Sequence, residues 1–216
     1  MGDLGPTTPE TNTAGDRRRI YAPSVQQERL WQGEILCELP QARLSLQSIS
    51  AIANSNAQGS ETSQQIQIDY EDHPFAVVLS QDCDLEKDDK RRKDGLAFLY
   101  NVLLCDVYYA DDLRERLRQE ENTGSSDWRV IKENRNARFQ FLSGVTVDQD
   151  ALGTGLPPLA VDFRMYFSIR TDEIYERLKL GLTRKRCRLQ TPYAEHLAHR
   201  FHSYQSRVPL AREHRA

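Results

Sequence analysis

The segment His73-Pro74-Phe75-Ala76-Val77-Val78-Leu79-Ser80 sets the architecture of this 216-residue chain. Its apolar run, 75–79, has no polar side, so an extended backbone there would bury side chains on both faces. A strand with one face in water would instead alternate apolar and polar residues. The segment therefore predicts a strand in the middle of a sheet.

Further strand patterns lie on both sides of this segment. They are 31–39, 44–49, 66–70, 96–107, 138–142 and 159–167. The segment 159–167 is the clearest of them, because every second residue in it is a large apolar one. Helix patterns do not alternate regularly with these strands, which argues against a strictly parallel sheet. We therefore expect an α+β fold in which short strands form a small twisted barrel or half-barrel.

Helix signals fall mainly in the second half of the chain. We expect helices at 26–30, 111–122, 126–131, 172–179 and 193–204. The last is the strongest, because Tyr193, Leu197, Phe201 and Tyr204 recur at helical spacing and form an apolar stripe that can dock on the sheet. The run 86–94 consists of charged residues alone and is expected to be a solvated loop, and the polar stretch 53–65 a mobile hairpin loop.

Composition excludes several classes of protein. The hydrophobic share is 38% and the mean hydropathy is -0.68, and no apolar run approaches the length of a membrane span. Residues 1–19 are too polar for a secretory signal. The four Cys residues include no CxxC pair, which argues against a small disulfide scaffold and a tandem zinc finger. We expect a cytoplasmic protein without a membrane partner.

The chain divides by composition into a domain and two tails. Residues 1–23 are predicted to be a disordered tail, because the stretch is rich in Gly, Pro, Thr and Asp. A barrel-like domain is expected over 24–190, with a helical insertion around 111–133. The helix at 191–206 would pack on the barrel, and 207–216 would be a flexible basic tail.

Charge is unevenly distributed along the chain. The net charge is -3, yet residues 181–216 carry +6, which leaves -9 for the rest. A basic end can bind nucleic acid or an acidic protein, or it can dock on the acidic body of its own chain or of a second copy. The basic residues that we assign to a binding surface are Arg184, Lys185, Arg186, Arg188, Arg200 and Arg207.

Several segments resemble the MazF/PemK-type toxins, whose fold is an SH3-like barrel. Gln32-Gly33-Glu34-Ile35 is similar to the Gly-Asp-Ile opening strand of that family, and the segment at 73–80 to its Arg-Pro-apolar-Val-Val-Ser strand. A late strand followed by the helix at 172–179 also fits. The resemblance implies an SH3-like barrel with inserted short helices and a C-terminal amphipathic helix, in a bacterial stress, toxin–antitoxin or phage-defence setting.

A second resemblance is to an uncharacterised group of bacterial proteins with a Ser-Gln-x-Cys-Asp signature. It is carried by Ser80-Gln81-Asp82-Cys83-Asp84-Leu85, by Arg138-Phe139-Gln140-Phe141-Leu142 and by the closing helix. No established activity attaches to that group.

The chain departs from the toxin family where that family cleaves RNA. The family has an Arg before the Pro of its second motif, but this chain has His73, and 96–107 contains no Ser or Thr for the supporting polar role. A His can act as base or acid in ribonuclease chemistry. Asp82 and Asp84, which follow the central strand, could assist His73, or could instead organise a turn by binding backbone N–H groups.

A metal site is not expected. Cys37, Cys83, Cys105 and His73 could meet at neighbouring strands, but they lack the spacing of a zinc motif, and buried free thiols are the better interpretation. We therefore predict no metal and no cofactor.

Three hypotheses about function remain open. The first is a non-catalytic interaction or RNA-binding module, which could be a homodimer. The second is a MazF-like, metal-independent endoribonuclease that uses His73 with help from Asp82 or Asp84. The third is an obligate subunit of a larger defence complex.

Overall fold

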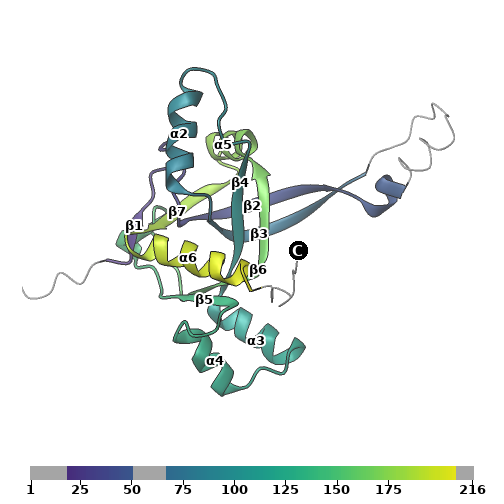
Figure 1. Ribbon diagram of the computed structural model, residues 1–216, viewed down its shortest axis with the longest axis vertical. Helices are drawn as coiled ribbons and strands as arrows, with labels where there is room; N and C mark the ends of the chain where they lie inside the picture. The colour runs from purple at the N-terminus through teal and green to yellow at the C-terminus, as the bar shows by residue number, and fades with distance from the viewer. Residues whose placement is uncertain (1–18, 51–66, 208–216) are drawn as a thin grey trace, which may run out of the picture.

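Ile68–Val78 forms the strand β3, which is the middle strand of a seven-stranded sheet, as the apolar run predicts (Figure 1). The computed structural model describes residues 19–50 and 67–207 and has an α+β fold. The sheet has the order β1-β7-β2-β3-β4-β6-β5, and every pair of neighbours is antiparallel. The other strands are β1 (Tyr21–Pro23), β2 (Glu34–Leu44), β4 (Asn101–Tyr109), β5 (Phe139–Leu142), β6 (Leu159–Arg170) and β7 (Arg184–Leu189).

The sheet is not closed by strand pairing. Its edge strands are β1 and β5, and within the described ranges no ladder joins them. A side-chain bond connects the two edges instead, because the hydroxyl of Tyr21 in β1 donates to the carbonyl of Ser143, just after β5, at 2.7 Å. Gln149, in the short 3₁₀ helix η1 (Val147–Gln149), also donates to the carbonyl of Tyr21, at 3.4 Å. The predicted barrel is thus an open, curved sheet.

All seven strands contribute to one apolar core on one side of the sheet. It includes Tyr21, Ile35, Phe75, Cys105, Leu142, Phe163 and Cys187, one from each strand. The helix α6 (Tyr193–Gln205) covers this core with Leu197 and Phe201, which are 1% and 4% exposed. The stripe predicted from helical spacing is confirmed, since Tyr193 and Tyr204 also pack against the same core.

The opposite face of the sheet is covered by α2 (Asp82–Arg92) and α5 (Thr171–Lys179). Leu85 and Ile174 are the buried anchors of these helices and pack on strand residues that alternate with those of the first core. The expectation of a solvated loop at 86–94 is wrong, because 86–92 belong to α2 and only 93–94 follow it. The physical reason is that its charges recur at i and i+4, where Glu86 pairs with Lys90 and Asp88 with Arg92 along the helix.

The predicted helical insertion is present. The helices α3 (Ala110–Glu120) and α4 (Ser125–Lys132) pack with Phe139 of β5 through a third cluster that includes Leu117 and Trp128. Arg200 of α6 donates to the carbonyls of Asn136 and Phe139, at 2.6 and 2.8 Å, and so ties α6 to this insertion.

Two predictions for the beginning of the chain are wrong. The predicted tail at 1–23 extends too far, because Tyr21–Pro23 is paired with β7 and Tyr21 is buried. Residues 26–30 form a turn and an irregular segment rather than a helix, and the side chain of Gln26 ties this segment to both backbone groups of Lys185 in β7. The stretch 53–65, residues 1–18 and residues 208–216 lie outside the described residues.

Across the parts of the chain that the structure describes, each helix is too short or too polar to cross a bilayer.

Candidate functional site

Two of the basic residues assigned to a binding surface are buried. The ammonium of Lys185 lies 3.4 Å from the carboxylate of Glu34 and donates to two backbone carbonyls, and both side chains are at most 1% exposed. Burial raises the pKa of Glu34 and lowers that of Lys185 from their ordinary values. Arg186 binds Asp150 with two hydrogen bonds of 2.8 and 2.7 Å. These cations stabilise the interior and are covered from an external partner.

Three more of the basic residues make contacts within the chain. Arg184 pairs with Glu38, Arg200 donates to backbone carbonyls, and Arg207 lies over the ring of Tyr204. For Arg184, Lys185 and Arg186, the structure agrees with the interpretation that the basic end docks on the acidic body of its own chain.

Arg188 is the one of these six basic residues that lines the pocket described below. Its guanidinium lies over the ring of Trp31, 4.4 Å from the ring centroid, and within the described residues no carboxylate lies at ion-pair distance from it. Trp31 also carries the guanidinium of Arg29 over its ring, at 3.5 Å. A half-buried arginine stacked on a tryptophan presents its in-plane N–H donors to whatever lies beside it.

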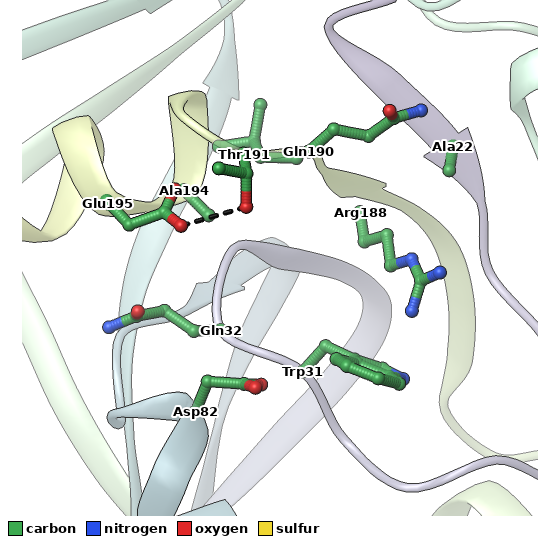
Figure 2. Close-up of a pocket in the computed structure, with 10 residues that line it drawn as sticks. Ala22, Trp31, Gln32, Asp82, Arg188, Gln190, Thr191, Ala194 and Glu195 are labelled. Carbon is green, nitrogen blue, oxygen red and sulfur yellow. Dashed lines mark hydrogen bonds between the residues drawn. The ribbon is translucent and has the colours of Figure 1, made fainter.

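A pocket of about 470 Å³ opens beside Arg188 and Trp31, which we call the Trp31 pocket (Figure 2). Its volume lies within the range of small-molecule sites. Four segments build it: the end of β1, the turn before β2, the first residue of α2, and the connection from β7 to α6. The polar residues that line it are Trp31, Gln32, Asp82, Arg188, Gln190, Thr191 and Glu195.

The turn before β2 sets how closely these segments approach. Gly33 has a φ of +77°, a conformation that favours glycine. A Cβ at this position would lie 3.0 Å from the Cβ of Ala194 in α6 and 3.1 Å from that of Leu189 in β7. Its amide donates to Val78 and its carbonyl accepts from Leu189. The missing side chain therefore lets α6 begin directly against the turn that carries Trp31.

Two glutamines that line the Trp31 pocket are held by hydrogen bonds within the chain. The side-chain amide of Gln32 donates to the carbonyl of Leu79 at 3.2 Å, and that of Gln190 to the carbonyl of Tyr21 at 3.1 Å. Each bond uses one of the two amide hydrogens, so the oxygen and the second N–H of each side chain keep their hydrogen-bonding capacity. The lining therefore offers both acceptors and donors, and Arg188 carries the only guanidinium among the described residues that form it.

The two carboxylates of the Trp31 pocket are held in different ways. Asp82 accepts from both nitrogens of Arg29, at 3.0 and 2.9 Å, so its charge is compensated. Glu195 accepts the hydroxyl of Thr191 at 2.8 Å with one oxygen, as the dashed line in Figure 2 shows. Its second oxygen has no hydrogen-bond partner among the residues that the structure describes.

His73 does not line the Trp31 pocket; it lies in β3 and is 3% exposed. Its Nδ1 lies 2.6 Å from Oδ1 of Asp106, and its ring stacks on Phe167 at a centroid distance of 3.8 Å. Tyr108 donates to the other oxygen of Asp106 at 3.0 Å, and burial raises the pKa of Tyr108 to about 12, which keeps it protonated as a donor. The Nε2 of His73 is buried with no partner in the described part of the chain.

The structure does not bring Asp82 and Asp84 together with His73. From His73 the strand β3 runs on to Val78, which is roughly 16 Å of extended chain, before α2 begins at Asp82. Asp82 and Asp84 are acids in the first turn of α2, where they interact favourably with the helix dipole. They therefore begin a helix and do not organise a turn, which was the alternative expected from the sequence.

No group of three His, Cys, Asp or Glu side chains in 19–50 and 67–207 is arranged to hold a metal ion. Cys37 and Cys105 are buried, whereas Cys83 is exposed on α2. The thiol of Cys105 donates to the carbonyl of Asp162 at 3.0 Å, and burial raises its pKa above the ordinary value.

Sequence reasoning missed Trp31 and Glu195 at the pocket and Asp106 beside His73. A lone tryptophan in a strand-like segment gives no signal that an arginine from β7 will stack on it. Asp106 lies inside an apolar strand, and a buried acid in such a run is itself a signal that a polar partner faces it.

Comparisons with protein-family models, with curated proteins and with solved structures find no match to this chain, so the case for a function rests on the chemistry of the Trp31 pocket.

Proposed function

We propose that this chain is a non-catalytic module that binds single-stranded RNA at the Trp31 pocket. The observation that carries the proposal is the stack of Arg188 on Trp31 beside a pocket of about 470 Å³. Arginine planes are among the surfaces on which proteins hold unstacked RNA bases, and the Trp31 ring, over which both Arg29 and Arg188 lie, orients the Arg188 plane. The charge of Arg188, which no described carboxylate compensates, would attract the phosphate backbone.

We also propose that the chain is related to the MazF/PemK-type toxins. The motif segments lie side by side in the structure, since 32–35 leads into β2 and 73–80 covers the end of β3, which pair with each other. A curved sheet whose seven strands share one core, with Tyr21 bridging its edges, supports a relation to SH3-like barrels. A bacterial stress, toxin–antitoxin or phage-defence setting follows only from that kinship.

Binding of a labelled mixed-sequence RNA, followed by fluorescence anisotropy, tests the proposal. Arg188→Ala is expected to weaken binding about 5- to 150-fold, the range for losing one arginine contact to a base, whether the contact is stacked or edge-on. Arg164→Ala is the matched control, because it removes one arginine from an exposed site on β6, outside the pocket. Equal loss in both variants, or no binding by the native chain, would refute the proposal.

The endoribonuclease hypothesis has one specific observation in its favour. The contact of His73 with Asp106 is the arrangement that orients a histidine base. Nε2 is covered, however, so a substrate reaches it only if the residues around it move. Cleavage of mixed RNA by the native chain, lost in His73→Ala and in Asp106→Asn, would establish this activity. Intact RNA at high protein concentration would exclude it.

A further inference from the structure

The polarity of the Trp31 pocket narrows the kind of base that it can hold. Gln32 and Gln190 each donate one amide N–H to a backbone carbonyl and keep an oxygen and a second N–H. Thr191 donates its hydroxyl hydrogen to one oxygen of Glu195, which leaves the other carboxylate oxygen as an acceptor. A ligand that meets Glu195 must therefore present hydrogen-bond donors toward it.

On the other side of the Trp31 pocket, Arg188 supplies donors. Its guanidinium is fixed over Trp31, and its in-plane N–H groups form a fork that suits two neighbouring acceptors. Figure 2 shows Arg188 and Glu195 on opposite sides of the pocket, with Trp31 and Asp82 along a third side. The pocket thus has a donor, Arg188, on one side and an acceptor, Glu195, on the other.

Guanine is the RNA base whose edges match both sides. Its O6 and N7 are neighbouring acceptors, for which a bidentate arginine is the commonest specific partner. Its N1–H and N2–H₂ are neighbouring donors on the next edge, and a carboxylate can accept both. Adenine, cytosine and uracil have no two neighbouring donors on their Watson–Crick edge, so one carboxylate oxygen of Glu195 would meet an acceptor in each of them.

Glu195 is the carboxylate best placed to accept from such a base. One of its oxygens is oriented by Thr191, and the other has no hydrogen-bond partner in the described residues. Asp82 already binds Arg29 with both oxygens. Glu195 lies in the first turn of α6, so the helix dipole also favours its ionised form.

We propose that the Trp31 pocket selects guanine, with Arg188 donating to the O6/N7 edge and Glu195 accepting from N1–H and N2–H₂. This inference rests on the proposed function in taking RNA as the source of the base. A free guanine nucleotide carries the same edges, and the experiment separates these two sources.

The experiment measures a ratio of affinities. Calorimetry compares guanosine and adenosine monophosphate, and anisotropy compares a uridine oligonucleotide that carries one guanosine with its counterpart that carries one adenosine. The native chain is expected to favour the guanine member of each pair about 5- to 150-fold, the range for one good bidentate contact.

Glu195→Gln is the decisive variant. It keeps an oxygen that can accept from Thr191 but removes the charge and one acceptor, so it should bring the guanine-to-adenine ratio close to one. Glu176→Gln, which removes an exposed carboxylate of α5 outside the pocket, should leave the ratio unchanged. A native ratio near one, or a preference that survives in Glu195→Gln, overturns the inference.

The two proposals fail in different ways. If RNA binds through Arg188 with no preference for guanine, RNA binding stands and guanine selection is wrong. If the monophosphates are discriminated but no RNA binds, guanine selection stands, the ligand is a free nucleotide, and the proposed function is wrong.

Discussion

The guanidinium of Arg29 binds the carboxylate of Asp82 through two parallel hydrogen bonds, of 3.0 and 2.9 Å. This pair joins the turn that carries Trp31 to the first residue of α2. It therefore fixes one wall of the Trp31 pocket without occupying the pocket's donor or acceptor side.

Replacing Asp82 should destabilise the fold more than replacing its neighbour. Asp82→Ala is expected to lower the free energy of unfolding by about 1–2 kcal/mol, because it leaves the largely buried Arg29 without its partner. Asp84→Ala, which removes an acid from the same helix turn but no ion pair, should cost about 0.3–1 kcal/mol. Urea denaturation measures both, and equal losses would show that the Arg29 pair adds nothing.

Lys185 is expected to be indispensable to the fold rather than to binding. Lys185→Met leaves Glu34 buried without its counterion, which should cost about 3–5 kcal/mol. The double variant Lys185→Met, Glu34→Gln removes both charges and should recover part of that loss. Urea denaturation of the two variants tests this, and a single variant as stable as the native chain would contradict it.

Acid should weaken the contact between Arg186 of β7 and Asp150 in the loop before β6, because protonation removes the charge of Asp150. Burial by itself would raise the pKa of Asp150, but hydrogen bonds from Arg186, from two backbone amides and from Thr154 lower it below the ordinary 3.8. A carboxyl with a lowered folded pKa contributes stability that is present above its unfolded value and is lost as the pH falls below it.

We therefore expect the free energy of unfolding to drop below about pH 4. The drop should be shallower in Asp150→Asn, which has no group to protonate at this position. Urea denaturation from pH 7 to acid compares the two chains, and identical slopes would show that Asp150 does not contribute.

The bond that spans the sheet edges should be measurable by itself. Tyr21→Phe removes only the hydroxyl that donates to Ser143, and the expected loss is about 1 kcal/mol. Tyr70→Phe is the matched control, because Tyr70 is 67% exposed. Should the two variants unfold at the same urea concentration, the edge bond would be without effect on stability.

The predictions of the central strand and of the C-terminal helix, which rest on the pattern of apolar residues, are confirmed. The apolar run at 75–79 identified a central strand, and the stripe from Tyr193 to Tyr204 identified the helix that covers the core. Both signals are local, since each depends on residues of one element and on the burial of its faces.

The errors came from charged residues whose partners the sequence pattern does not identify. Lys185 and Arg186 look like a basic surface until Glu34 and Asp150 are brought beside them by the order of the strands. The charged run 86–94 looks like a loop because a solvated helix held by i,i+4 pairs and anchored by Leu85 has little apolar periodicity. The contact of His73 with Asp106 depends in the same way on the pairing of β3 with β4.

Gly33 sets the separation between the turn that carries Trp31 and the start of α6. A Cβ at this position would lie 3.0 Å from the Cβ of Ala194, so any side chain there would push these two segments apart and shift Glu195 relative to Arg188. The spacing of the pocket walls thus depends on a residue that contributes a hydrogen atom and no side chain.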